Sequence, residues 1–226
     1  MPAQAGLTRD AIAGLVLAAG GSTRMGPEHN KLIERVGERP LVAVVVDALI
    51  AAGIRTVVVV TGFEAQRVRE ELAGRACRFV HHAGWQAGMG ESIACGMRAL
   101  REEQAPPAAV LVSVGDLPGL RAEHVEAVVA AALSEPGAIV PARIVVPSFA
   151  GRRGHPVLFG AAHFEALAGL RGDEGARAIL ATNPQAVRVV EVTGDGIVRD
   201  VDTLADLAAA RMQADPGTAR SAKEES

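Results

Sequence analysis

The chain has 226 residues, of which 49% are hydrophobic and 3% aromatic, and it contains no tyrosine. This length fits one medium-sized α/β domain, because such folds routinely reach about 200 or more residues before they divide. The formal net charge of −3, from 23 basic and 26 acidic residues, provides no overall positive field for nucleic acid or anionic lipid. The composition therefore argues against a nucleic-acid partner, and it favours helices packed on a valine-rich sheet.

The sequence lacks the patterns of an exported or membrane protein. No apolar run approaches the roughly 18–20 residues of a membrane span. The apolar run at 11–19 is preceded by Arg9 and Asp10 rather than by a basic cluster, which is unlike a signal peptide. Cys77 and Cys95 lie far apart, without disulfide-framework or zinc spacing. We therefore expect a cytoplasmic protein.

Short apolar runs alternate with helical periods along the chain, which is typical of β-α-β units around a mostly parallel sheet. The runs are rich in valine and do not alternate with polar residues, as expected for strands covered on both faces. The predicted strands are 14–18, 56–60, 78–81, 110–114, 138–140 and 187–192, and the predicted helices are 41–52, 64–73, 92–102, 122–133, 161–168 and 174–181. This order predicts a Rossmann-like three-layer α/β sandwich.

A glycine-rich loop follows the first predicted strand, at the usual phosphate site of an open α/β sheet. Gly20 and Gly21 are expected to adopt positive φ and to let a phosphate approach the backbone N–H groups. Arg24 and Lys31 supply positive charge and donors for phosphate oxygens. The loop is not a P-loop, because Pro-Glu stands at the Lys-Ser/Thr positions, and it lacks G-x-G-x-x-G. We predict a triphosphate site, with a tight turn carrying an exposed arginine as the alternative.

Three aspartates are candidate ligands of Mg²⁺, which prefers oxygen ligands and needs only one or two protein carboxylates beside substrate phosphates. Asp116 follows the predicted strand 110–114 in a sharp Gly-Asp-Leu-Pro turn, with an Asx-turn or helix N-cap as its alternative role. Asp200 and Asp202 have the same side-chain parity on an extended segment, so both can face one site. Capping of a helix that begins near Thr203 is the alternative for Asp202.

Residues 145–158 interrupt the strand–helix rhythm. Prolines and glycines divide this segment into two short extended pieces, which predicts a hairpin or flap. A flap on a regular scaffold is a common place for substrate contacts. The end of the chain is polar and charged, so we predict one domain over residues 1–212 and a disordered tail over 213–226.

Segments spread over residues 14–207 resemble the nucleotidyltransferase signature of the MobA-like family, and within it the molybdenum cofactor cytidylyltransferases. The segments are LAAGGSTRMG at 17–26 with Lys31, WQAGMGES at 85–92, GDLP at 115–118, GRRGHPVLF at 151–159, GDEGAR at 172–177 and RDVDT at 199–203. The resemblance implies a nucleotide-diphospho-sugar-transferase-like fold. It also implies Mg²⁺-dependent transfer of a nucleoside monophosphate from a nucleoside triphosphate to a phosphate acceptor, with loss of pyrophosphate.

Residue by residue, the resemblance gives Arg24, Lys31 and Asp116 catalytic roles, and it suggests that at least one of Asp200 and Asp202 completes the metal site around Asp116. The substrate-binding candidates are Leu17, Ala18, Ala19, Gly20, Gly21, Gly90, Ser92, Arg153 and His155. Gly90 and Ser92 would meet the base or ribose, with an ordinary helix start as the alternative. Arg153 and His155, with Arg152, would gather positive charge for an anionic pterin phosphate, with solvated hairpin charges as the alternative.

The resemblance implies a molybdopterin cytidylyltransferase, because Leu-Ala-Ala-Gly at 17–20 is similar to the CTP-using branch and the GTP-using branch more often has glycine in place of Ala19. Such an enzyme would serve a molybdenum hydroxylase or its maturation chaperone. It needs no general base, because a phosphate monoester oxygen is already ionised near neutral pH. The alternatives are a transferase with another phosphate acceptor, an NAD(P)H-dependent reductase of the same family, and a non-catalytic cofactor carrier.

Overall fold

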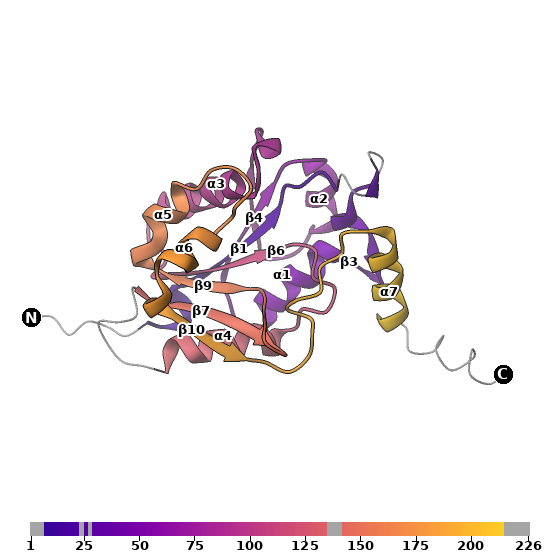
Figure 1. Cartoon of the computed structure of the whole chain (residues 1–226). Coiled ribbons are helices and arrows are strands. Elements are labelled where there is room, and N and C mark those ends of the chain that lie inside the picture. Colours follow the sequence, from indigo (N-terminus) through magenta and orange to yellow (C-terminus); the bar gives the residue numbers. More distant parts are fainter. Residues whose placement is uncertain (1–6, 23–24, 27–28, 135–141, 215–226) are drawn as a thin grey trace, which may run out of the picture.

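The computed structural model describes residues 7–22, 25–26, 29–134 and 142–214. Within these residues, eight strands form a central sheet in the order β10-β7-β9-β6-β1-β4-β5, with β8 paired to β7 (Figure 1). The strands are β1 (Ile12–Ala18), β4 (Thr56–Thr61), β5 (Arg78–His81), β6 (Ala109–Val114), β7 (Ile144–Phe149), β8 (Arg152–Arg153), β9 (Val157–Gly160) and β10 (Val187–Glu191). β1 pairs in parallel with both β4 and β6, whereas β9 runs antiparallel to its neighbours. The sheet is therefore mostly parallel.

Helices cover both faces of this sheet (Figure 1). The α-helices are α1 (Leu41–Ala51), α2 (Ala65–Glu71), α3 (Met89–Arg101), α4 (Ala122–Leu133), α5 (Phe164–Ala168), α6 (Arg177–Thr182) and α7 (Leu204–Ala214). Short 3₁₀ turns are η1 (Arg9–Ala11), η3 (Lys31–Ile33), η4 (Trp85–Ala87), η6 (Ala161–His163) and η7 (Pro184–Ala186), and β2 (Arg35–Val36) pairs with β3 (Arg39–Pro40).

The alternation of side chains along β1 divides the core into two layers. Ile12 and Val16 point into a cluster that contains residues of α1, α2 and α4. Leu15 and Leu17 point to the opposite face, into a cluster with α3, α5 and α6. Every residue of β1 is buried, which accounts for the continuous apolar character of this strand, since both of its faces are covered. The predicted three-layer α/β fold is confirmed.

Most predicted elements lie where the sequence placed them, with shifts at their ends. The predicted helix 92–102 begins earlier, at Met89, and the predicted helix 174–181 begins only at Arg177. The predicted strand 138–140 lies outside the described residues. The predicted tail starts within α7, which extends to Ala214, and residues 215–226 also lie outside the described part.

The predicted hairpin is present between β7 and β9. The chain reverses at Ala150 and Gly151, which have φ of 49° and 76°, and the short β8 pairs antiparallel with the end of β7. However, β7 and β9 are buried members of the main sheet rather than arms of a surface flap. Both strands are apolar on both faces and so can lie between helices; only the tip of the hairpin projects.

The described helices include none that is both long and apolar enough to span a membrane.

Candidate active site

The loops after β1 and β6 meet at the carboxyl end of the sheet because these two strands are parallel neighbours. The backbone N–H of Gly115 donates to the carbonyl of Leu17 at 3.0 Å, and the N–H of Phe63 donates to the carbonyl of Ala19 at 3.0 Å. The side chains of Leu17, Ala18 and Ala19 are buried in the core. These three predicted substrate-binding residues therefore position the loop, and their side chains face away from it.

The glycine-rich loop differs in detail from the prediction. Neither Gly20 nor Gly21 has a left-handed φ; positive values occur instead at Ser22 (50°) and Gly26 (99°). A Cβ at Gly21 would lie 2.6 Å from the ring of Trp85, whereas a Cβ at Gly20 would meet nothing within 4 Å. Gly21 is therefore required for the close packing of Trp85, and Gly20 leaves an open backbone that a ligand can approach.

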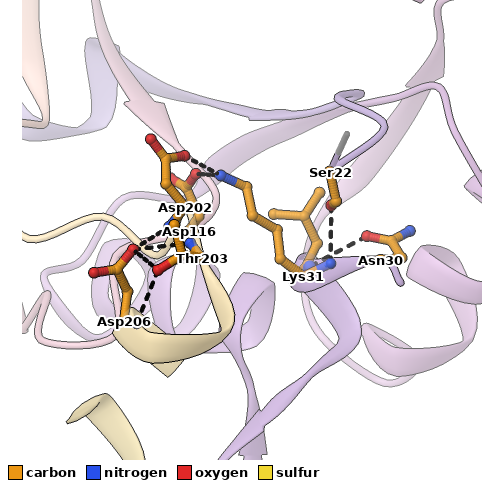
Figure 2. A network of polar contacts seen from close by, with 8 residues as sticks. Ser22, Asn30, Lys31, Asp116, Asp202, Thr203 and Asp206 are labelled. Atoms are coloured by element: carbon orange, nitrogen blue, oxygen red, sulfur yellow. Dashed lines mark hydrogen bonds and ion pairs between the residues drawn. The ribbon is translucent and has the colours of Figure 1, made fainter. Parts of the chain in front are cut away.

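Lys31 is held by hydrogen bonds on both sides of its backbone. Its N–H donates to the Ser22 hydroxyl at 2.9 Å, and the buried Asn30 side chain accepts from the N–H of Leu32 at 3.1 Å. Its ammonium Nζ lies 2.6 Å from Oδ2 of Asp116 and 2.8 Å from Oδ1 of Asp202 (Figure 2). The structure thus joins three residues that the sequence nominated separately. We call Lys31, Asp116 and Asp202 the lysine–aspartate cluster.

A capping box that the sequence analysis missed orients Asp202. The Asp206 carboxylate accepts from the N–H and the hydroxyl of Thr203, at 2.8 and 2.7 Å, and the Asp206 N–H donates back to the Thr203 hydroxyl at 3.2 Å (Figure 2). Thr203 therefore caps α7, and Asp202 turns toward Lys31 instead of capping the helix. The sequence Thr-x-x-Asp before an apolar run is a recognised capping signal that would have identified this pair.

Burial and the attraction between opposite charges together set the pKa values of the lysine–aspartate cluster. Burial raises the pKa of Asp116, and the neighbouring Lys31 offsets this only in part, while the charge of Asp200 raises it further. For Lys31, burial acts to lower the pKa, but the two carboxylates outweigh it and the pKa is raised. The lysine is therefore a firmly protonated counter-ion of the carboxylates at neutral pH.

One carboxylate oxygen of Asp116 makes no hydrogen bond with the described residues. This oxygen, Oδ1, is buried, and such a group is costly to bury unpaired. An oxygen of this kind suits a divalent cation such as Mg²⁺. Asp116, Asp200 and Asp202 do not form a group of three or more ligands that could hold a metal alone, nor does any other set in the described residues. A metal here would need ligands from its substrate.

His155 lies near the lysine–aspartate cluster but is not a cation. Its backbone N–H donates to the carbonyl of Ile197 at 2.9 Å, and its ring Nδ1 lies 3.3 Å from the carbonyl of Val112. Burial lowers its pKa, although the charges of Asp116 and Asp200 act the other way. The expectation that His155 adds positive charge is therefore wrong near neutral pH. Arg153 is exposed on β8.

Asp200, whose charge acts on Asp116, lines a groove of about 530 Å³. Four arginines from separate parts of the chain line it, namely Arg39, Arg121, Arg152 and Arg199. The charge of Arg199 is balanced within the groove by Asp195, at 3.1 Å. Arg121 is likewise paired, with Glu123 at 3.4 Å. Arg39 and Arg152 are therefore the arginines that make this surface suited to an anionic group.

The structure places Gly90 and Ser92 apart from the lysine–aspartate cluster, at the first turn of α3. The N–H of Gly90 donates to the carbonyl of Gly172 at 2.7 Å, and the buried Ser92 hydroxyl lies 3.4 Å from the carbonyl of Gly88. A Cβ at Gly90 would lie 2.7 Å from the carbonyl oxygen of Arg171. These residues join α3 to the 171–175 loop, and their contact with a base or ribose stays a prediction. Arg24 lies outside the described residues.

Comparison with known proteins finds a family model, curated relatives and solved structures to which the chain is similar. The model of the MobA-like NTP transferase domain matches residues 14–189. Nicotine blue oxidoreductase of Paenarthrobacter nicotinovorans is 31% identical over 85% of this chain and 93% of its own length. The bifunctional protein GlmU of Carboxydothermus hydrogenoformans is 36% identical over 51% of this chain, which spans only 24% of GlmU. Among solved structures, Rv0371c from Mycobacterium tuberculosis in complex with manganese shares the fold, with a TM-score of 0.69. The similarity covers 91% of this chain and 98% of that one, at 23% sequence identity.

Proposed function

The chain belongs to the MobA-like NTP transferase family, and on this premise we propose that it transfers CMP from CTP to a molybdopterin-type pterin phosphate and releases pyrophosphate. The observation that carries the proposal is the lysine–aspartate cluster at the carboxyl ends of β1 and β6. It combines a protonated ammonium with carboxylates beside an open glycine backbone, which are the groups that a metal-bound triphosphate requires. The choice of base rests on Ala19 in the Leu-Ala-Ala-Gly segment.

On the nucleotide side, the chain would act by positioning and by charge. The open backbone at Gly20 lets a phosphate oxygen approach the loop N–H groups. Lys31, with Arg24 by resemblance to the family, would offset the charge of the departing pyrophosphate. The fixed backbone of Lys31 leaves its long side chain to follow the phosphates.

Asp116, with Asp202 or Asp200, would hold the divalent cation. The unpartnered Oδ1 of Asp116 is the feature that fits such an ion, and a protein of the same fold has been crystallised with manganese. When bound, the cation would neutralise phosphate charge and make the α-phosphorus more electrophilic. We propose Mg²⁺, since one or two protein carboxylates beside substrate phosphates are its usual ligands.

The arginine-lined groove is the proposed place of the acceptor. It is lined by Asp200, two residues before Asp202 of the lysine–aspartate cluster, and by Arg152 at the hairpin tip. Arg153 and the neutral His155 flank the same hairpin and stay candidates for acceptor contacts. The acceptor phosphate is ionised at neutral pH, so its oxygen can attack the α-phosphorus without a general base. The dinucleotide product would then pass to a molybdenum hydroxylase or its maturation chaperone.

A second candidate function is that of a reductase that uses NAD(P)H as its electron donor. The likeness to nicotine blue oxidoreductase over 93% of that protein favours it, whereas the missing G-x-G-x-x-G fingerprint speaks against it. A nicotinamide oxidation assay with nicotine blue distinguishes the two candidates.

Pyrophosphate release tests the proposal. CTP, GTP and ATP are each incubated with the full chain, with and without Mg²⁺, and with a pterin phosphate or a panel of sugar phosphates. The proposal predicts release with CTP, Mg²⁺ and the pterin together. Release only with a sugar phosphate would overturn the acceptor assignment, and oxidation of NAD(P)H without any pyrophosphate release would overturn the transferase assignment.

A further inference from the structure

The lysine–aspartate cluster already contains a cation. Nζ of Lys31 lies within 2.8 Å of carboxylate oxygens from both Asp116 and Asp202, which are two of the proposed ligands of the metal. We propose that the Lys31 ammonium holds the place of the divalent cation until the nucleotide binds, so that metal and nucleotide load together. This inference rests on the proposed function, because it concerns the same site and gives Lys31 a role before the reaction.

Buried, ionised carboxylates without a counter-ion are energetically unfavourable. The Asp116 side chain is only 12% exposed and that of Lys31 15%, so water screens their charges poorly. Asp200 adds a further negative charge that acts on Asp116. An ammonium that touches two of these carboxylates stabilises the empty site, where an uncompensated buried charge would be strongly unfavourable.

A lysine and a dication compete for the same oxygens. Oδ2 of Asp116 and Oδ1 of Asp202 are in contact with the ammonium, and a metal bound to both carboxylates would lie against an ammonium of like charge. Oδ1 of Asp116 is the buried carboxylate oxygen of the lysine–aspartate cluster without a partner among the described residues, and a single carboxylate oxygen binds a divalent cation weakly. A metal that arrives alone must therefore displace Lys31.

The Lys31 ammonium can move away from the carboxylates while the backbone of the residue stays in place. Hydrogen bonds to Ser22 and from Leu32 to Asn30 fix the backbone around it, whereas its four-carbon stem is flexible. The neighbouring glycine-rich loop is the proposed triphosphate site, so phosphate oxygens would offer the ammonium new partners within reach of this stem. A nucleotide would thus favour metal binding, and by linkage the metal would favour nucleotide binding.

Binding of Mn²⁺ to the full chain in the absence of nucleotide tests this inference, with free Mn²⁺ measured by electron paramagnetic resonance. Lys31→Met keeps the apolar stem and removes the charge, so Mn²⁺ should bind about tenfold more tightly than to the wild type. Lys31→Arg keeps the charge and should bind as weakly as the wild type. The double variant Lys31→Met with Asp116→Asn should lose the gain. Equal or weaker Mn²⁺ binding by Lys31→Met would overturn the inference.

Lys31→Gln is the second variant, for use if Lys31→Met does not fold, and circular dichroism identifies the folded protein. A further arm adds a non-hydrolysable CTP analogue, which should tighten Mn²⁺ binding more in the wild type than in Lys31→Met. If the proposed function is wrong, the analogue changes neither protein, while the gain from Lys31→Met without nucleotide persists. Failure of the two proposals is therefore distinguishable.

Discussion

Lys31 and Asp202 are 171 residues apart in the sequence, yet their charged groups lie 2.8 Å apart. The lysine follows the loop after β1, and the aspartate immediately precedes the capping residue of α7. Asp116, in the loop after β6, contacts the same ammonium. Three separate segments thus place their charges at one edge of the sheet.

Replacing Asp116 by asparagine should abolish transfer but leave the protein at least as stable as the wild type. Loss of the carboxylate should lower kcat by about 100-fold or more, since the proposed ligand of the cation that neutralises phosphate charge is removed. Burial raises the pKa of Asp116 in the folded state, so its ionised form opposes folding at neutral pH and a neutral amide does not. Pyrophosphate release and thermal melting measure the two effects.

The control for Asp116→Asn is Asp47→Asn, which removes from α1 a partly exposed partner of Arg75. It should keep full activity and lower Tm slightly. An Asp116→Asn protein that transfers CMP at the wild-type rate would contradict the assigned role.

Alanine at Gly21 should lower stability, whereas alanine at Gly20 should weaken CTP binding. A Cβ at Gly21 would collide with the Trp85 ring at 2.6 Å, so Gly21→Ala should cost about 1–3 kcal/mol of stability through overpacking. Gly20 has open space around it, so Gly20→Ala should melt as the wild type does but bind CTP more weakly. Fluorescence of Trp85, the single tryptophan, reports binding in both variants. Unchanged CTP affinity in Gly20→Ala would argue against phosphate contact with this backbone.

Removal of the α7 cap should impair catalysis more than folding. Thr203→Ala deletes the hydroxyl that both donates to Asp206 and accepts from it, at a cost of about 1 kcal/mol for a lost N-cap. Because the same turn directs Asp202 toward Lys31, kcat should fall about tenfold. Thr203→Ser retains the hydroxyl and should restore both properties. A Thr203→Ala enzyme with an unchanged kcat would show that the cap does not orient Asp202.

His155 should make folding sensitive to mild acid. Burial lowers its pKa below the usual 6.5, so the unfolded chain binds more protons than the folded one just below that pH. The stability that the folded protein gains by keeping His155 neutral is therefore fully present above about pH 6.5, and it is lost as the pH falls through the lowered pKa. His155→Gln should remove this contribution, so that its Tm falls less than that of the wild type between about pH 7 and pH 5. Parallel melting curves for the two proteins over this range would contradict the assignment.

The sequence was sufficient for the fold and for the chemistry of the cluster, but not for its contacts. Continuous valine runs predicted buried parallel strands, and the parallel pairing of β1 with β6 brings Lys31 toward Asp116. The contact between Lys31 and Asp202 depends on the path of the chain from β10 to α7, which no local pattern encodes. The reason for Gly21 is likewise non-local, because Trp85 packs against it from another loop.

The buried character of the hairpin strands was missed because Pro147, Gly151, Gly154 and Pro156 suggested a surface flap. In the structure, a Cβ at Gly154 would lie 2.1 Å from the carbonyl oxygen of Ile197, so this glycine serves close packing rather than a turn. The capping pair Thr203 and Asp206 was readable from the sequence, in contrast, because its spacing is local.

Transfer of label from CTP is the most direct test of the central claim that this chain is a cytidylyltransferase. CTP radiolabelled at either the α- or the γ-phosphate is incubated with the full chain, Mg²⁺ and a pterin phosphate. The account predicts that the α-label moves to the pterin product, that the γ-label appears in pyrophosphate, and that Asp116→Asn abolishes both. Recovery of all label as CTP, under conditions in which the folded protein binds CTP, would contradict it.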